Sequence, residues 1–464
     1  MDHDRTVLPL CAVVTLAIVA SCSAALGGRA PASLPSGWTS HNFEPIGHTD
    51  LDGRPAFKMT ITENDGRWYL FAAHIFHSGL TVLDVTDPGA PRTVRFIPGA
   101  ENTLTLQVDL ADDILITSLE KNFLDPRTEG KPFDEGVVIW DVGDPENPKR
   151  LGQFETGGTG THRNFYAGGK YMHLAAGMPG YRGNIYVIVD VSDPANPVEA
   201  GRWWVAGQHE AGGEKLSEGA DADPVNHGFA HEHDRGLCGT DSDVSLHGPP
   251  YVVGNRVYLP YGSAGLIILD ISDVRSPQQI GQLDFSPPFH SKFGVHSVIP
   301  FEDETLAYVN SESVTYEKGP LHHSSLVDIS NPVKPILLGL LPEPTPPAGA
   351  PYEDFFAKGG WRGPHNANHL LHNPDVQPQG DILYVAHFNA GLRAYDISNP
   401  RLPRETGFFM APEPTERLGY LPRGKLVLQA EDVLVDRRGY IYVSHKNQGI
   451  WVVRYRGDGS PGGD

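Results

Sequence analysis

Four histidines stand at matching positions in four consecutive stretches of the chain, and imidazole is a side chain that binds metals. Each begins a short apolar segment that leads through a turn into a second apolar segment; they are His162, His247, His296 and His365. The second segment starts 10 residues after the first two histidines and 11 after the third, whereas a longer insertion follows His365. Neutral imidazole is a good ligand for Fe, Cu, Zn and Ni. The pattern predicts a transition-metal site, provided that the fold gathers the four segments; the alternative is four polar strand ends bonded to solvent or backbone.

A carboxylate occupies the corresponding position of a later stretch. The same count, taken back from Ile441, reaches Glu431. Carboxylates often hold the second nitrogen of a ligand histidine. We therefore expect Glu431 to be a functional carboxylate that orients one of the four histidines.

Further histidines and two neighbouring residues are weaker candidates for substrate contacts or for support of the ligands. Three histidines end the second apolar segment of their stretch: His74, His387 and His445. Two belong to an H-x-x-x-H-x-H run in a long insertion, where they could bind a metal directly or form a lid: His231 and His233. Two more residues lie near a loop that we expect to wall a pocket: Trp361 and Arg362. Three other histidines near the predicted ligands compete with them for the assignment: His290, His369 and His372.

The elements that position these residues follow from a phrase that the chain repeats six times. Each copy is an apolar strand that ends in Asp, followed by a polar turn and, in most copies, two prolines. The copies read LTVLDVTDPGAP from Leu80, VVIWDVGDPENP from Val137, VIVDVSDPANP from Val187, LIILDISDVRSP from Leu266, SLVDISNPVKP from Ser325 and LRAYDISNPRLP from Leu392. Asp and Asn bond the backbone of such turns and Pro fixes φ, so we interpret the phrase as structural. Repeats of this kind build arrays of small β-sheets.

Each copy is the third of four predicted strands. In the fourth unit, for example, we expect strands over 247–253, 256–261, 266–271 and 279–283. A seventh unit near 433–454 lacks the phrase and a fourth strand, and residues 44–48 resemble the missing strand. The sequence thus predicts an all-β fold, a seven-bladed β-propeller of four-stranded blades over residues 39–457, whose last blade is closed by an N-terminal strand. First strands line the channel of a propeller, so the four histidines would converge at one mouth. Insertions at about 208–246 and 342–363 would lie on the rim.

The repeated phrase resembles the LVIVD-repeat family of exported bacterial proteins. This resemblance implies a β-propeller and says nothing about chemistry, because propellers carry many unrelated activities. The four-histidine arrangement alone is similar to that of the carotenoid-cleaving dioxygenases, propellers in which four histidines hold Fe(II), and to the selenium-binding-protein family with its copper-linked thiol oxidase activity. The chain lacks the motifs of both families, so neither substrate is transferred.

Composition and the chain ends indicate an exported protein. The 57 acidic residues outnumber 36 basic ones, which gives a net charge of −21 and disfavours a nucleic-acid partner. Residues 1–22 resemble a signal peptide that ends in a lipobox-like Val-Ala-Ser-Cys, so we expect a lipid anchor at Cys22, or else plain secretion. Residues 23–38 are typical of a flexible tether and 458–464 of a disordered tail. We expect a periplasmic or cell-surface location, with no membrane contact other than the anchor.

Three functions fit these patterns. The first is a metal-dependent oxidoreductase, of the dioxygenase or oxidase type, that uses O2 at a four-His centre holding Fe(II) or Cu, and acts on a small organic substrate. The second is a surface binding or scaffold propeller without catalysis. The third is a non-redox hydrolase, lyase or isomerase that uses a metal such as Zn. The sequence contains neither a phosphate-binding G-x-x-x-x-G-K-[ST] loop nor a G-x-S-x-G elbow.

Overall fold

The computed structural model describes residues 1, 34–76, 78–215, 244–285, 293–312, 322–419 and 421–457. The chain divides into two units, 1–33 and 34–464. Of the first, only Met1 is described, so the predicted signal peptide and its Cys22 lie outside the described residues. The same holds for His231 and His233 in the long insertion, for His290, and for the predicted tail. None of the described helices is long and apolar enough to cross a membrane.

The described residues from 34 to 457 fold as successive antiparallel four-stranded units, and in all but the last unit the four strands follow one another in the chain. The first three units are β3 (Met59–Asn64), β4 (Arg67–Ala73), β5 (Gly79–Asp84) and β6 (Arg92–Pro98); β8 (Val108–Ala111), β9 (Ile114–Lys121), β10 (Gly136–Asp141) and β11 (Lys149–Phe154); and β12 (Gly160–Phe165), β13 (Tyr171–Gly177), β14 (Asn184–Asp190) and β15 (Val198–Trp203). The second and third units are bridged where β9 pairs with β12, and the short β7 (Thr103–Leu104) also pairs with β9.

The next three units repeat this order. They are β16 (Tyr251–Val253), β17 (Arg256–Pro260), β18 (Leu266–Asp270) and β19 (Gln278–Leu283); β20 (Phe293–Pro300), β21 (Leu306–Glu312), β22 (Ser324–Asp328) and β23 (Ile336–Leu340); and β24 (Pro364–Ala367), β25 (Ile382–His387), β26 (Gly391–Asp396) and β27 (Arg404–Met410). Helical segments are short and lie between strands: η1 (Pro126–Thr128), η2 (Glu210–Gly212), η3 (Gly262–Ala264), α3 (Phe355–Lys358) and η4 (Phe388–Ala390).

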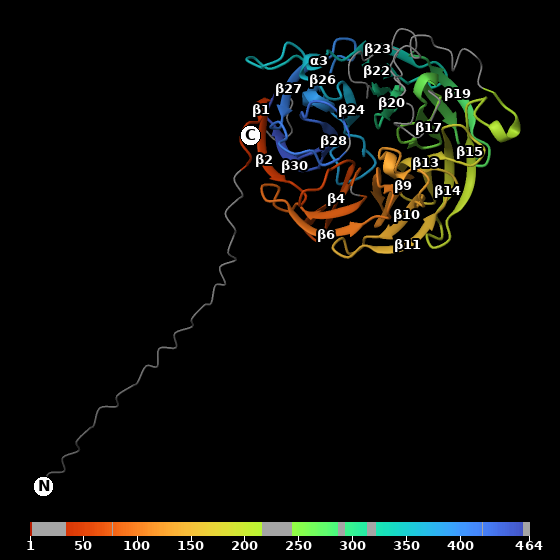
Figure 1. Cartoon of the computed structure of the whole chain (residues 1–464), viewed down its shortest axis with the longest axis horizontal. Helices are drawn as coiled ribbons and strands as arrows, with labels where there is room; N and C mark the ends of the chain where they lie inside the picture. Colours follow the sequence, from red (N-terminus) through yellow and green to blue (C-terminus); the bar gives the residue numbers. More distant parts are fainter. Residues whose placement is uncertain are drawn as a thin grey trace. The chain divides into compact units, whose positions relative to one another are not determined.

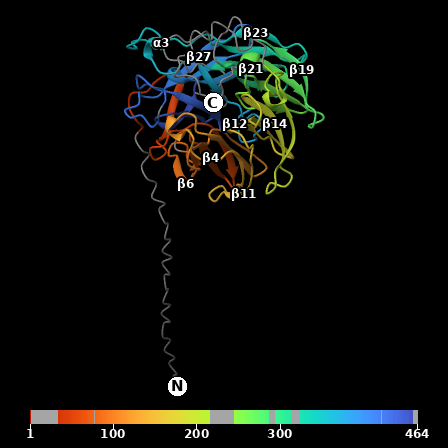
Figure 2. The same cartoon turned by 45° about the vertical axis from the view of Figure 1, so that its right-hand side comes forward.

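The last sheet joins the two ends of the folded unit. Its strands are β28 (Ala430–Val435), β29 (Ile441–His445), β30 (Gly449–Tyr455) and, from the N-terminal side, β2 (Phe43–Thr49). β2 pairs with β30 from Phe43↔Tyr455 to Thr49↔Ile450, and β1 (Thr39–His41) adds to the outer edge of β27. Figure 1 shows these red N-terminal strands beside the blue C-terminal ones, and Figure 2 shows the same order in a second view. The described strands thus group into seven four-stranded units, which is compatible with the seven predicted blades, and the N-terminal strand completes the last sheet as expected.

The repeated phrase makes turns, as its residues indicated. In all six copies the Asp that ends the third strand accepts a hydrogen bond from the backbone N–H two residues later: Asp84 from Thr86, Asp141 from Gly143, Asp190 from Ser192, Asp270 from Ser272, Asp328 from Ser330 and Asp396 from Ser398. The same turns also contact the preceding sheet. A Cβ at the glycine of the preceding fourth strand would overlap a turn carbonyl, as at Gly152 with Pro194, Gly201 with Val274 and Gly281 with Pro332. Glycine therefore allows neighbouring sheets to approach closely.

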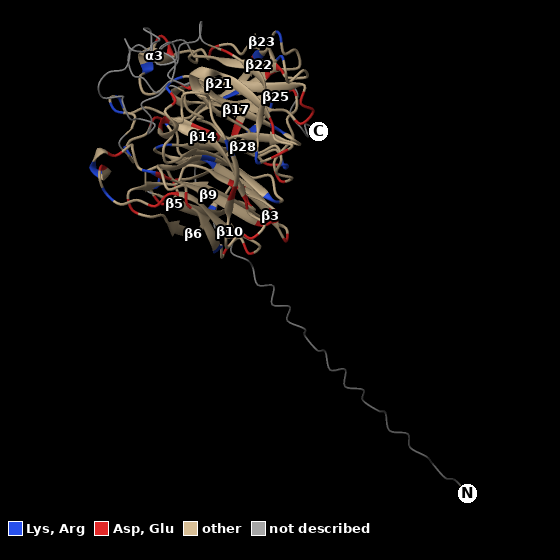
Figure 3. Ribbon diagram, turned by 90° about the vertical axis from the view of Figure 1, so that its right-hand side faces the viewer, with Lys and Arg blue, Asp and Glu red and all other residues tan. Residues whose placement is uncertain are grey.

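Apolar side chains fill the spaces between adjacent sheets. Strands from neighbouring units contribute to common clusters; Ile268 of β18, Val309 of β21 and Val385 of β25 belong to one of them. In the ribbon of Figure 3, acidic (red) and basic (blue) positions are interspersed along the chain. This sheet-on-sheet packing fixes the first strand of each unit, on which the candidate site depends.

Candidate metal centre

The structure brings the four aligned histidines together at one end of the first strands. His162 lies on β12, His296 on β20 and His365 on β24, while His247 precedes β16 and donates its backbone N–H to the carbonyl of Pro260 on β17. The ring centroids of successive histidines are 4.5, 4.7 and 5.0 Å apart along the series His162, His247, His296 and His365. All four side chains are buried. Equivalent positions of the repeated sheets therefore place four imidazoles side by side.

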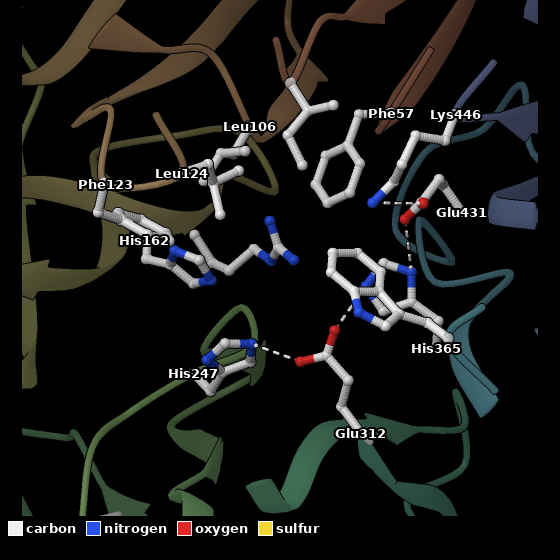
Figure 4. A pocket seen from close by; sticks show the side chains of 13 residues that line it. Phe57, Leu106, Phe123, Leu124, His162, His247, Glu312, His365, Glu431 and Lys446 are labelled. Carbon is white, nitrogen blue, oxygen red and sulfur yellow. Dashed lines mark ion pairs between the residues drawn. The ribbon is translucent and has the colours of Figure 1, made fainter. Parts of the chain in front are cut away.

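A carboxylate that the sequence analysis did not identify lies among these rings. Glu312 is the last residue of β21, and its Oε2 is 3.2 Å from His247 Nε2 and 3.8 Å from His296 Nε2. Its Oε1 is 3.5 Å from His365 Nε2. One ligand atom each from His247, His296 and Glu312 lie within 4.8 Å of one another, a grouping that could hold a metal ion. Figure 4 shows the Glu312 carboxylate between His247 and His365.

Three of the histidines are held through Nδ1, which leaves Nε2 directed toward the group. His162 Nδ1 lies 2.7 Å from Glu120 Oε2, His296 Nδ1 lies 2.7 Å from its neighbour Ser297 Oγ, and His365 Nδ1 lies 3.2 Å from Glu431 Oε2. Nε2 of His162 and of His296 is buried without a hydrogen-bond partner among the described residues. Metal-ligating histidines have this arrangement, because a partner at one ring nitrogen fixes the tautomer that presents the other. The buried Nε2 atoms without partners thus fit a metal ion.

The protonation states favour the same chemistry. Burial lowers the pKa of His162 and of His296 well below the usual value, and burial lowers the pKa of His247 to about 4. Burial opposes ionisation of Glu312, but the hydrogen bond from His247 and nearby positive charge outweigh it and lower the pKa of Glu312 to about 2. Neutral imidazoles beside an ionised carboxylate are the forms that bind metals.

Glu120 and His162 form a buried pair that shares a proton. Burial raises the pKa of Glu120 to about 8, while burial also holds the His162 ring neutral. When Glu120 is ionised and His162 carries its single ring proton on Nδ1, that N–H donates to Glu120 Oε2 across 2.7 Å, and Nε2 keeps its lone pair and can act as a ligand. A metal ion at Nε2 would favour this ionised state of Glu120.

A small cavity adjoins the histidines. It has a volume of about 50 Å³ and is lined by both apolar and charged side chains. The apolar lining consists of Phe57, Ile75, Leu106, Phe123, Leu124 and Trp361, and the charged lining of Arg163, Glu312, Glu431 and Lys446. Figure 4 shows Leu106, Leu124 and Phe57 facing His162, His247 and Glu312 across this space. A small molecule in the cavity would lie next to the imidazoles of His162, His247 and His365, which also line it.

Glu431 has the position that the sequence predicted, beside a histidine rather than among the rings. Its Oε2 is 3.2 Å from His365 Nδ1 and its Oε1 is 2.9 Å from Lys446 Nζ. Lys446 in turn lies 3.7 Å from the centroid of the Trp361 ring. Burial opposes ionisation of Glu431, but the charge of Lys446 and the contact with His365 lower its pKa. Glu431 can therefore position His365, and the role predicted for it in the sequence remains a prediction.

The weaker candidates have mixed positions. Trp361 lines the cavity, whereas Arg362 lies outside the lining, with its guanidinium 4.6 Å from the Phe356 ring centroid. His74, His387 and His445 are buried but do not line the cavity. His74 Nε2 contacts Thr81 Oγ1 at 2.7 Å, and His387 Nε2 lies 3.2 Å from the hydroxyl of Tyr395.

The two described histidines that competed for the assignment belong to other contacts. His369 Nδ1 is 3.1 Å from Lys58 Nζ, and His372 Nε2 is 3.0 Å from Asp109 Oδ1. Neither lines the cavity beside the four aligned histidines.

Comparison with known proteins supports the fold and leaves the chemistry open. The model of the LVIVD repeat matches residues 169–204, 251–284, 325–341 and 373–411. Comparison with curated proteins gave no match. Similar solved structures include the β-propeller domain of Cps50 (Swd1) from Myceliophteria thermophila, with 10% identity, a TM-score of 0.50, and coverage of 90% of this chain and 99% of that one.

Two further structures have the same degree of similarity. The periplasmic gluconolactonase PpgL of Pseudomonas aeruginosa has 13% identity and a TM-score of 0.50, with 87% and 97% of the two chains covered. The RRP9 WD40 repeats have 9% identity and a TM-score of 0.51, with 89% and 97% covered. Identities this low show the fold alone. The chain is therefore a β-propeller that carries LVIVD repeats.

Proposed function

We propose that this propeller is a metal-dependent oxidoreductase whose metal ion is held by the four aligned histidines and Glu312. The observation that carries the proposal is the shared orientation of the rings: Nδ1 of three histidines has a side-chain partner, and two buried Nε2 atoms have none. Leaving such atoms buried and unbonded is unfavourable by about 1–3 kcal/mol each, which a metal ion would offset. A polar channel without a metal would more often pair those nitrogens with protein groups.

The donor set favours iron or copper. His247, His296 and Glu312 form a two-histidine, one-carboxylate group, which is typical of non-haem Fe(II) enzymes that use O2. Additional imidazoles from His162 and His365 suit Fe or Cu equally well, and Zn remains compatible with the same donors. A bound Fe(II) or Cu ion would supply electron exchange with O2.

The side chains of the protein would orient the ligands, limit access of water and hold the substrate. Glu120, Ser297 and Glu431 would hold His162, His296 and His365 in the ligand orientation. The apolar lining, which includes Phe123, Leu124 and Leu106, would limit the water that reaches the centre. The cavity beside the imidazoles would admit a small organic substrate.

Metal analysis of purified protein tests the proposal. We expect one equivalent of Fe or Cu per chain after expression with the metal supplied, and loss of at least nine-tenths of it in His296→Ala and in Glu312→Gln. Glu304→Gln is the matched control, because Glu304 bonds Tyr258 and Arg256 and lies outside the cavity lining. Absence of a stoichiometric transition metal, or unchanged metal content in both variants, would refute the proposal and favour a binding propeller without catalysis.

The identity of the metal distinguishes a redox from a non-redox enzyme. The similarity to a structure named as a gluconolactonase rests on 13% identity and carries no chemistry by itself. Stoichiometric Zn, with no Fe or Cu taken up when these are supplied, would replace the oxidoreductase by a hydrolase, lyase or isomerase that uses the same histidines.

A further inference from the structure

The cavity beside the histidines has two kinds of wall, and together they indicate what it binds. Phe57, Leu106 and Leu124 provide an apolar wall. The cationic side chain of Arg163 and the carboxylate of Glu312 line the same space. Arg163 follows His162 on β12, is 2% exposed, and stacks with its Cζ 5.0 Å from the Phe57 ring centroid. The position of this guanidinium is therefore set by the same strand that positions a ligand histidine.

The charges that line the cavity balance only in the absence of a metal ion. Arg163 and Lys446 are positive, whereas Glu312 and Glu431 are negative. Lys446 is paired with Glu431 at 2.9 Å, and Glu312 contacts the histidines. A divalent ion held by the proposed ligands would add two positive charges beside an apolar wall, and ionised Glu120 behind His162 would offset only one of them. Buried charge is unfavourable unless a counter-ion accompanies it.

We propose that the substrate is a small organic anion, whose acid group lies against Arg163 and whose apolar part lies against Phe57, Leu106 and Leu124. The inference rests on the proposed metal centre, because the excess charge arises from the ion. Arginine is suited to the role, since its planar guanidinium binds a carboxylate through two parallel hydrogen bonds. Lys446 is less suited, because Glu431 and the Trp361 ring already hold its ammonium group.

The size of the cavity limits the anion. A volume of about 50 Å³ accommodates a few water molecules. An anion of roughly four to seven non-hydrogen atoms would replace those waters. A short branched or unsaturated carboxylate satisfies both the charge and the size, whereas a long-chain fatty acid or a polyene does not fit within the described lining.

A Co(II)-loaded protein provides a direct test, because the visible spectrum of Co(II) changes when a ligand enters the site. Isobutyrate and isobutyramide serve as probes, since both have the same shape and only the first is charged. At constant ionic strength, we expect isobutyrate to change the spectrum saturably and to bind at least tenfold more tightly than isobutyramide. Equal affinities for the two probes, or no change with either, would overturn the anion proposal.

Variants of Arg163 separate this residue from direct binding of the carboxylate to the metal. Arg163→Gln should keep one Co(II) per chain and weaken isobutyrate binding by about 10- to 100-fold, the range expected for loss of charge-assisted hydrogen bonds. The isobutyrate affinity of Arg163→Lys should lie between those of Arg163→Gln and the wild type, because lysine keeps the charge but lacks the planar guanidinium that makes two parallel hydrogen bonds. Unchanged isobutyrate affinity in Arg163→Gln would overturn the assigned role of the arginine.

Failure of the wild-type protein to take up Co(II) would overturn both the metal centre and the anion site, whereas Co(II) uptake without selectivity for the anion would overturn the anion site alone.

Discussion

Glu120 provides a sensitive test of the metal centre, because it contacts a proposed ligand without lining the cavity. Its Oε2 lies 2.7 Å from His162 Nδ1, and both side chains are buried. In the metal-bound protein, where Glu120 would be ionised, Glu120→Gln keeps the shape and replaces a charge-assisted hydrogen bond of about 1.5–3 kcal/mol by a neutral one of about 0.5–1.5 kcal/mol. The difference of about 1–1.5 kcal/mol corresponds to a metal affinity about 5- to 12-fold weaker. Glu120→Ala loses the whole contact, which predicts an affinity about 10- to 140-fold weaker.

The assay is competition for Zn(II) or Co(II) between the metal-free protein and a chromophoric chelator at pH 7.5. Glu304→Gln again serves as control, and we expect its affinity to equal that of the wild type. Thermal unfolding of each metal-free variant separates loss of fold from loss of affinity. Affinities of Glu120→Gln and Glu120→Ala within twofold of the wild type, in folded protein, would refute the view that Glu120 positions a ligand.

Three further predictions concern the fold around the site. Burial lowers the pKa of His173 to about 3. Because its unfolded pKa is about 6.5, the unfolded state binds more protons, so this residue should reduce the free energy of unfolding by up to about 1.4 kcal/mol per pH unit as the pH falls from about 6 toward 3.5. His173→Gln should flatten that slope in urea unfolding between pH 4 and 6.5, and an unchanged slope would contradict the assignment. Asp436 is fully buried and accepts hydrogen bonds from Arg438 and Tyr442. Asp436→Ala should therefore lower the free energy of unfolding by about 3–5 kcal/mol in the same assay. A loss below about 1 kcal/mol would show that these hydrogen bonds add little to stability. In Gly281→Ala the added Cβ would overlap the Pro332 carbonyl, so the variant should lose about 1–3 kcal/mol of stability and melt at a lower temperature. Gly380→Ala is the control, because nothing lies within 4 Å of its added Cβ and its melting temperature should not change. Equal melting temperatures for the two variants would contradict the close contact at Gly281.

The fold was accessible from the sequence because the signal is repeated. Asp84 and its counterparts in the other copies bond the backbone of the following turn, so one turn recognised in one copy locates the third strand of every copy. The same alignment predicted that His162, His247, His296 and His365 would lie side by side. The contact between fourth-strand glycines and the next turn was not accessible, because it depends on how closely two sheets approach.

Glu312 escaped prediction although the relevant rule was available. The second strand of each unit returns to the end at which the first begins, and this rule selected His387 and His445 as strand-end residues. Applied to carboxylates, it selects Glu312 at the end of β21 and Glu120 near the end of β9. Acidic residues at strand ends are common in a chain with 57 of them, so the type of residue alone gave no reason to choose these two. Glu312 and His387 both end the second strand of their unit. The Glu312 carboxylate lies among the aligned histidines, whereas the His387 ring contacts the hydroxyl of Tyr395.

The pairing of β2 with β30 also determines when the protein can finish folding. His48 contacts the carbonyl of Gln448, 400 positions later in the chain, so these partners meet only after nearly the whole polypeptide has been synthesised. Contacts so distant in sequence form slowly, because a long loop must close before they stabilise anything. Until then the exposed edge of β30 is open to pairing with other chains. β28, which carries Glu431, belongs to the same sheet. Metal uptake should accordingly follow ring closure, and a chain that stops short of β30 should neither close nor hold the ion.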